Sequence, residues 1–420
     1  MATTLAPSTS VRKVIGETEL LWMMALLMAL NAFGIDAILP ALDELAVDLG
    51  VDGNARQFVI GVYLLTAGIG ALLPGALADR FGRRPILLGS ILVYILLSLL
   101  SAIAPTYDTL IAVRAAQGFF AAGTVALPPA IIRDRVGGDK MARMMSLIFV
   151  IFLMVPAVAP SIGEAILLVA DWRAIFGFMA VMGVAVGAWV HLRLPESLAP
   201  DNRQPIHLRT IAVNMTRALA LPSVVGYVFG SALVFGALFG FINSSQQLIT
   251  ETFGAGDIFP LVFGICAGSM AVASWSNSRI VERFGARRVS HAALFVFIAV
   301  SGAQVFFAFQ PGESLWVFVP LMAINMALLG FIGSNFGAIA MNPFFNIAGA
   351  ASSAHGFVRM TMAALLGGAI GYAFDGTAQP LALSLLASGL TCLVLVLVSE
   401  KGKLFGPSDA EAGMGSAPAE

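Results

Sequence analysis

Long apolar stretches alternate along this chain with short segments rich in charge, proline and glycine. A membrane-spanning helix needs about 20 mostly apolar residues. With loops placed at the polar clusters, the pattern predicts twelve such helices. The first six lie near 19–41, 57–78, 85–104, 108–131, 143–169 and 173–193, and the second six near 222–249, 258–278, 289–309, 315–340, 353–374 and 379–398. The pattern therefore predicts an all-α membrane protein.

The composition agrees with a membrane protein. Charged residues make up 11% of the 420 positions and hydrophobic residues 59%, whereas roughly 25% of an ordinary soluble protein is charged. A chain with so few charges cannot cover its own surface in water, so its natural solvent is the lipid bilayer. The net charge of −1 gives no sign of a nucleic-acid partner, because the charges are divided among loops. Cys266 and Cys392 lie in apolar stretches, which favours packing over a disulfide or a metal site.

A short basic turn occurs twice, with its acidic residues 203 positions apart, close to half the length of the chain. Residues 78–84 read ADRFGRR and residues 281–287 read VERFGAR, and each copy lies between two apolar stretches. Such internal duplication is common among secondary transporters. It predicts two six-helix bundles, at 19–194 and 221–399, joined by a linker at 195–220. A cytoplasmic N-terminal segment at 1–18 and a disordered tail at 400–420 complete the predicted organisation.

Lysine and arginine are unevenly distributed among the loops. If both termini are cytoplasmic, 19 of the 23 basic residues lie on the cytoplasmic side, and only Arg56 and Arg173 lie in outer loops. Arg114 and Arg359 fall within spans. This asymmetry is the one that the positive-inside rule describes. The sequence therefore predicts a multi-pass protein of a bacterial inner membrane with both termini in the cytoplasm.

Strongly polar side chains recur in every third predicted span: the first, fourth, seventh and tenth. In a duplicated bundle this period predicts that these four spans line a central cavity that binds substrate. The alternative is that the amides join helices to one another, at about 1 kcal/mol per contact. The amides expected at the cavity are Asn31, Gln117, Asn243, Gln246, Asn325 and Asn335.

Three charged residues within the spans are predicted to share one depth. Asp36, Arg114 and Glu164 each lie six or seven residues from an outer loop, which places them on the order of 10 Å below the outer surface. A charge inside the bilayer costs about 2.5–3.5 kcal/mol on insertion scales, so it usually has a partner and a function. Two carboxylates share one guanidinium here, which leaves one carboxylate free to bind a proton. We predict that this cluster carries a coupling proton; the alternative is a static Asp36–Arg114 pair with Glu164 in the outer vestibule. Arg359 can either extend to the inner surface or act directly.

These motifs resemble those of the major facilitator superfamily, and within it the drug/proton antiporters of the bicyclomycin and chloramphenicol exporter type. The sequence GALADRFGRR at 75–84 is similar to the superfamily signature between spans two and three. RAAQG at 114–118 is similar to the span-four motif of proton-coupled members, and FGIDAILPAL at 33–42 to the span-one motif of the exporter group. The resemblance implies that the loop between spans two and three latches the two halves on the inner side. The residues implied in this conformational gate are Gly75, Asp79, Arg80, Gly82, Arg83 and Arg84.

The fifth predicted span resembles the antiporter motif, with PAVAPSIG at 156–163. The resemblance implies that Pro156, Pro160 and Gly163 bend the helix and let it pack closely, which resists proton leak. Glu164 departs from the family, which usually has a small residue at this position.

Together these observations predict a proton-coupled exporter of small amphipathic or drug-like molecules that works by alternating access. By the resemblance it acts as a monomer, and no cofactor or metal is predicted. The alternative of the same fold is a proton-coupled metabolite symporter. An integral-membrane enzyme is disfavoured, because the histidines at 191, 207, 291 and 355 show no catalytic or metal-ligand spacing. A sensor that does not transport is disfavoured, because it needs no charged layer inside the membrane.

Overall fold

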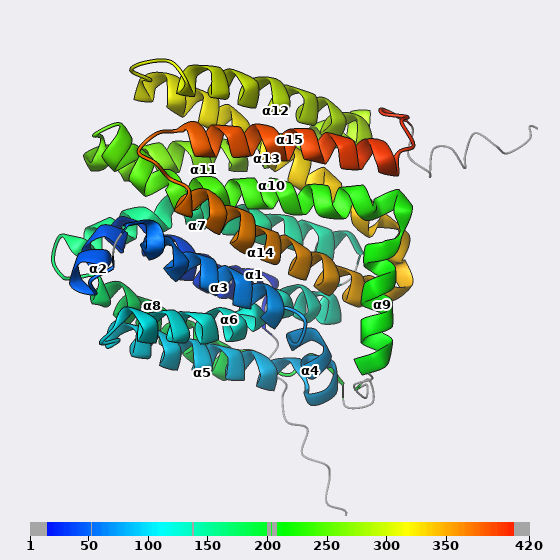
Figure 1. Cartoon of the computed structure of the whole chain (residues 1–420). Coiled ribbons are helices and arrows are strands. Elements are labelled where there is room, and N and C mark those ends of the chain that lie inside the picture. Colours follow the sequence, from blue (N-terminus) through cyan, green and yellow to red (C-terminus); the bar gives the residue numbers. More distant parts are fainter. Residues whose placement is uncertain (1–14, 52, 137, 200–202, 204–207, 407–420) are drawn as a thin grey trace, which may run out of the picture.

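A computed structural model describes residues 15–51, 53–136, 138–199, 203 and 208–406. The predicted N-terminal segment up to residue 14 and the predicted tail from residue 407 lie outside the described residues. The described chain is a bundle of long helices that run side by side, without a strand (Figure 1). The long helices are α1 Glu17–Asp36, α5 Arg83–Ala102, α6 Tyr107–Arg135, α7 Gly138–Leu167, α8 Arg173–Arg193, α10 Pro222–Gln247, α11 Phe259–Phe284, α12 Ala286–Ala308, α13 Leu315–Met341, α14 Ala348–Tyr372 and α15 Gln379–Ser399. The shorter helices are α2 Leu42–Asp48, α3 Phe58–Gly70, α4 Pro74–Phe81 and α9 Leu208–Ala220.

Each predicted span coincides with a long helix or with the pair α3 and α4. Within the described residues, nine helices are long and apolar enough to cross a membrane, or ten if the α3–α4 pair, bent by 44°, is one span. Helices α7 and α14 occupy the two remaining predicted positions. Polar residues such as His355 and Arg359 lower the hydropathy of α14. The all-helical membrane fold is confirmed, and the membrane crossings of α7 and α14 stay a prediction.

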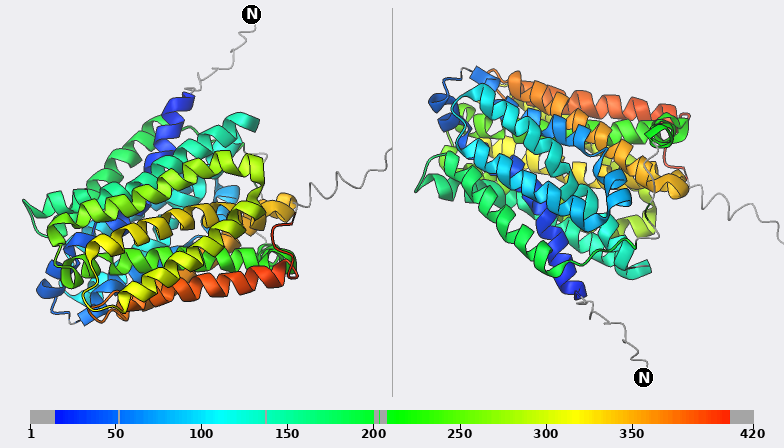
Figure 2. Two further views of the ribbon diagram at one scale, coloured as in Figure 1. Left: turned by 90° about the horizontal axis from the view of Figure 1, so that it is seen from above. Right: turned by 90° about the horizontal axis from the view of Figure 1, so that it is seen from below.

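The two halves of the chain repeat the same packing. In the first half, α5 packs against α6 and α8, and α3 against α6; in the second, α12 packs against α13 and α15, and α11 against α13. The halves meet where α3 packs against α14 and where α7 packs against α11 (Figures 1 and 2). Helices α3 and α11 each correspond to the second predicted span of their half, and α7 and α14 to the fifth. Both contacts between the halves therefore join a second span to a fifth span, as expected for two related halves.

The duplicated basic turn has the same backbone in both copies. Gly82, with a φ of 104°, ends α4 and donates its N–H to the carbonyl of Ala78 at 3.0 Å. Gly285, with a φ of 78°, ends α11 and donates to the carbonyl of Val281 at 2.9 Å. A positive φ favours glycine, because other residues have a Cβ atom that clashes there. The shared Phe-Gly sequence therefore encodes the same helix-to-helix turn in each half.

The bundle has two chemically different ends. The end with the duplicated turns, Arg83 and Arg287, is called the basic end below; the opposite end, with α2 and the 3-10 turn Gly53–Gln57, is called the acidic end. Helix α9 crosses the basic end (Figure 1) and packs against α14, so the predicted linker contains a helix. At the same end, Phe405 packs against His291 of α12, so the chain after α15 stays in contact with the bundle up to this residue.

Candidate functional site

A cavity lies between the two halves and extends toward the basic end. Its empty volume is about 1270 Å³, including the part that is open to solvent, and Met341 and Ser352 line it near the basic ends of their helices. A deeper compartment of about 720 Å³ adjoins it toward the acidic end, where Asp36 and Phe263 contribute to the wall. The two compartments share the lining residues Asn31, Phe152, Phe235, Leu238, Met270 and Met360. The two compartments are therefore adjacent parts of the space between the halves.

The wall of the deep compartment is rich in aromatic and thioether side chains, whereas the wall of the larger compartment also contains several serines and glycines. Phe239, Phe241 and Met326 line the deep compartment with the shared phenylalanines and methionines. Such side chains adapt to apolar bodies of different shape, while a few polar groups fix orientation. Within the described chain, no group of three or more His, Cys, Asp or Glu side chains gathers as a metal site. The geometry suits reversible binding of an amphipathic molecule.

Asp36 is the buried carboxylate of the deep compartment. It is the last residue of α1, its exposed fraction is 2%, and its Oδ1 has no hydrogen-bond partner. No described cation lies within ion-pair distance of it, so the alternative of a static pair with Arg114 is not found. A carboxylate that lacks such a partner is costly to bury as an anion. It is therefore suited to bind a proton or a cationic group.

Arg114, on α6, fastens three helices of the first half together. Its Nη2 donates to the carbonyl of Gly34 at 2.6 Å, its Nε to the carbonyl of Val59 at 3.2 Å, and its Nη1 to Oε1 of Gln117 at 2.7 Å. The guanidinium also stacks on Tyr63, 4.4 Å from the ring centroid. The last carbonyls of a helix carry partial negative charge, so the end of α1 partly balances this buried cation. Arg114 thus fixes the backbone two residues before Asp36.

Asn31 connects the cavity to this buried arginine. It lines both compartments, and its Oδ1 accepts a hydrogen bond of 2.9 Å from the hydroxyl of Tyr63. Tyr63 in turn lies under Arg114. A polar chain therefore runs from the cavity through α3 to the cation.

Glu164 does not join the buried layer, so this part of the prediction is wrong. Its side chain is exposed. The neighbouring Gly163 faces α1, where a Cβ atom would lie 2.1 Å from the carbonyl oxygen of Ala37. Successive helical residues point about 100° apart, so a glycine that packs against α1 directs Glu164 elsewhere. Of the other motif residues, Pro156 lines the deep compartment and Pro160 is buried.

Of the six amides predicted at the cavity, only Asn31 lines it. Three bond to side chains within their own half: Gln117 with Ser98 at 2.7 Å, Asn325 with Gln304 at 2.6 Å, and Asn335 with Asn277 at 2.8 Å. Asn243 is buried against Gly371 and neither of its amide atoms has a partner. Gln246 lies at the acidic end. The four helices predicted to line the cavity do so, but mainly with apolar side chains.

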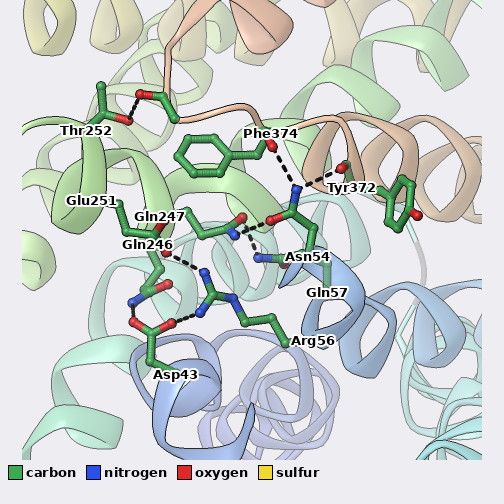
Figure 3. Close-up of polar contacts among 11 residues, drawn as sticks. Asp43, Asn54, Arg56, Gln57, Gln246, Gln247, Glu251, Thr252, Tyr372 and Phe374 are labelled. Carbon is green, nitrogen blue, oxygen red and sulfur yellow. Dashed lines mark hydrogen bonds and ion pairs between the residues drawn. The ribbon is translucent and has the colours of Figure 1, made fainter. Parts of the chain in front are cut away.

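A polar network joins the two halves at the acidic end (Figure 3). Arg56, from the turn before α3, forms ion pairs with Asp43 of the first half and with Glu251, which follows α10 in the second half. Gln246 of α10 donates to the same Asp43. The prediction missed this network, although Arg56 was one of only two outer arginines. Glu251, the partner of Arg56 in the second half, lies 195 residues away along the chain, and no local sequence pattern indicates this pairing.

Amides extend the network beside the arginine (Figure 3). The Nε2 of Gln57 donates to Gln247 at 3.0 Å, and the Nε2 of Gln247 donates to Oδ1 of Asn54 at 2.7 Å. The Nδ2 of Asn54 donates to the carbonyls of Tyr372 and Phe374, at 2.8 and 2.7 Å. The first half is therefore bonded to both α10 and the end of α14.

At the basic end, the first copy of the turn, at 78–84, contacts its own half through the bonds between described residues. Arg83 pairs with Asp79 at 2.6 Å and with Asp134 at 3.1 Å. Glu196 accepts from the backbone N–H groups of Arg83 and Arg84, at 2.9 and 3.2 Å, and so caps the start of α5.

The remaining gate residues of the turn also make no bond to the described residues of the second half. Arg80 is exposed and lies over Phe81, and a Cβ atom on Gly75 would meet open space. Between pairs of described residues, the hydrogen bonds and ion pairs that join the halves all lie at the acidic end. The structure is therefore closed at that end, and its cavity extends toward the other.

Comparison with known proteins gives one family. Residues 24–372 match the family model described as Major Facilitator Superfamily. The chain is 31% identical over 359 residues to the bicyclomycin resistance protein homolog of Haemophilus influenzae, over 85% of this chain and 90% of that protein. It is 28% identical over 344 residues to the multidrug resistance protein MdtL of Salmonella paratyphi C, over 80% and 83% of the two chains.

Solved structures share the fold at low sequence identity. The crystal structure of a D-xylose-proton symporter matches with a TM-score of 0.69 at 17% identity, over 91% of this chain and 99% of that one. The crystal structure of the human organic anion transporter MFSD10 matches with a TM-score of 0.63 at 15% identity, over 92% and 100% of the two chains. At this identity, the similarity concerns the fold alone.

Proposed function

The chain belongs to the Major Facilitator Superfamily, and from this premise we propose that it exports small amphipathic, drug-like molecules from a bacterium in exchange for protons. It is a multi-pass membrane transporter. The relatives named for bicyclomycin and multidrug resistance support the substrate class. The deep compartment between the halves, rich in phenylalanine and methionine, suits such molecules. A bundle closed at one end, with a cavity toward the other, is one of the two states that alternating access requires.

The charges of the loops indicate which end of the bundle faces the cytoplasm. The basic end faces the cytoplasm if the positive-inside rule holds for this chain. The structure then corresponds to an inward-facing state, in which Arg56 and its partners close the outer side. In the opposite state, the turn at 75–84 engages the second half and closes the inner side. Rocking of the two six-helix halves interconverts the states.

Asp36 carries the coupling proton in this proposal. The observation behind it is a buried carboxyl with an unpartnered Oδ1, in the wall of the compartment between the halves. Protonation from the outside lets the empty transporter turn inward, and substrate binding at the inner side displaces the proton. Each 100 mV of membrane potential supplies about 2.3 kcal/mol per charge, which is enough to drive substrate uphill. Arg114 acts as a positioning residue, since it holds the carbonyl of Gly34.

A vesicle experiment tests the direction of transport. A growth assay in an exporter-deficient bacterium first selects a compound against which this chain protects. Everted membrane vesicles that contain the protein are then energised, and the accumulation of the compound inside is measured. We expect accumulation that a protonophore abolishes. Accumulation only in right-side-out vesicles would contradict export and support the symporter.

A further inference from the structure

Arg359 is a cation within the central cavity that the mechanism above does not use. It lies on α14 and lines the larger compartment. Its guanidinium stacks on Phe235, 4.7 Å from the ring centroid, and its Nε is buried without a hydrogen-bond partner. Within the described chain, no carboxylate lies within ion-pair distance of it. Its side chain faces the cavity rather than extending to the inner surface.

A cation at this depth needs more than one aromatic ring to balance it. A charge within the bilayer region is costly, and such residues normally pair with another group or line a substrate path. A guanidinium presents five N–H donors in a planar fork, which matches a carboxylate or a similar acidic group. Arg114 donates to two backbone carbonyls, whereas the buried Nε of Arg359 has no acceptor. The missing partner can therefore come from a molecule in the cavity.

The same space holds one acidic group at its deep end. Asp36 lines the compartment that adjoins that of Arg359, and Phe235 and Met360 line both. A molecule that rests on Phe235 therefore lies between a carboxyl from the first half and a guanidinium from the second. An amine at Asp36 would compete with the coupling proton for the same oxygen atoms, as exchange of substrate for protons requires.

We propose that Arg359 binds an acidic group of the transported molecule, and that the cavity selects molecules with an acidic group and an amine on one apolar aromatic body. This inference rests on the proposed function for the transport step, but the binding step is independent of it. Because the two charged groups belong to different halves, one bound molecule bridges them during rocking.

The test uses three compounds with the same aromatic body. Norfloxacin carries a carboxylate and an amine, its methyl ester lacks the carboxylate, and its N-acetyl derivative lacks the basic amine. Binding to the full chain in phosphatidylcholine nanodiscs is measured by equilibrium dialysis, using quinolone fluorescence. We expect norfloxacin to bind about tenfold more tightly than its methyl ester, the effect of one charge-assisted contact. Equal affinities of the wild-type protein for these two compounds would overturn the proposal without any variant.

Variants test whether Arg359 is the residue that binds the carboxylate of norfloxacin. Arg359→Gln should abolish the preference for norfloxacin over its ester, and Arg359→Lys should keep part of it, because a point charge remains. Arg279→Gln is the matched control, since Arg279 also stacks on a ring, that of Trp275, but is exposed outside the cavity. An unchanged preference in both Arg359 variants would overturn the assignment.

A second bilayer separates a solute from a lipid headgroup as the acidic partner. In phosphatidylglycerol nanodiscs, the same order of affinities supports a dissolved substrate. Loss of the norfloxacin preference there would mean that the anionic headgroup occupies Arg359, and would overturn the proposal. If the ester discrimination holds but energised vesicles accumulate nothing, the binding inference stands while the proposed export fails. If vesicles accumulate other compounds while norfloxacin and its ester bind equally, the proposed export stands while the binding inference fails.

Discussion

Replacing Arg56 by glutamine should open the acidic end of the bundle. Arg56 is the only described cation between Asp43 of the first half and Glu251 of the second. In Arg56→Gln, both ion pairs are lost, and the two carboxylates face each other without a cation. The neighbouring contacts of Asn54 with α14 remain. The change therefore weakens the closure without removing it.

The size of the effect follows from the exposure of the pairs. The side chain of Arg56 is 13% exposed, and those of Asp43 and Glu251 are 40% and 43% exposed. Pairs of this kind contribute about 0.2–1 kcal/mol each. Loss of both should shift the equilibrium between states by roughly 0.4–2 kcal/mol, or about 2- to 30-fold.

Electron spin resonance can measure this shift as a distance distribution. Spin labels at Val47 and Asp257, both exposed near the acidic end, report the separation of the halves; the buried Cys266 and Cys392 are replaced by serine. We expect Arg56→Gln to increase the population with long distances.

The matched control is Arg173→Gln, because Arg173 pairs with Asp48 at the same end but within one half. A distribution unchanged by Arg56→Gln, or shifted equally by the control, would refute the assignment of this network as the outer closure.

Three further predictions concern the turn and the buried layer. Gly82→Ala should destabilise the protein by about 1–2 kcal/mol, because its φ is 104° and a Cβ atom would lie 2.5 Å from Glu196; thermal unfolding should show the loss, whereas Gly89→Ala, which meets open space, should not. Glu164→Gln should keep proton-driven export in vesicles at the wild-type level, because Glu164 is exposed; loss of transport would return it to the coupling site. Arg114→Lys should lower transport at least about tenfold while the protein still inserts, since a lysine cannot donate to three separated acceptors; full activity would show that the positioning of α1 does not need the guanidinium.

The helices were predictable because their cause is local. A bilayer requires a continuous apolar stretch, and the span predicted at 173–193 coincides with α8. The bend between α3 and α4 was not predicted, although its signal was present, since Pro74 lies within the span predicted at 57–78. The repeated turn was predictable for the same reason: Gly82 and Gly285 encode their own backbone conformation.

The direction in which each side chain points from its helix was much less predictable than the position of the helix. Depth along a helix follows from its rise, so Asp36 and Arg114 were expected within the buried layer, and both are buried. The direction of a side chain depends on what the next helix presents. Gly163 packs against α1, and this contact, which no span contains by itself, leaves Glu164 exposed.

Amide partners are nonlocal as well. Asn335 bonds to Asn277, 58 residues away on another helix, and so contributes to packing rather than to the cavity. From the sequence, each amide could either line the cavity or join two helices. The choice between them depends on which polar residue the neighbouring helix presents.

The most direct test of the central claim compares two transport modes of Asp36→Asn in proteoliposomes, with the compound selected by growth. The account predicts that a proton gradient no longer drives accumulation of the compound, while exchange of labelled for unlabelled compound continues at a measurable rate. Retained exchange also shows that the variant is folded and inserted. Proton-driven accumulation by Asp36→Asn at the wild-type level would contradict the account, because no other buried carboxyl lines the cavity in the described chain.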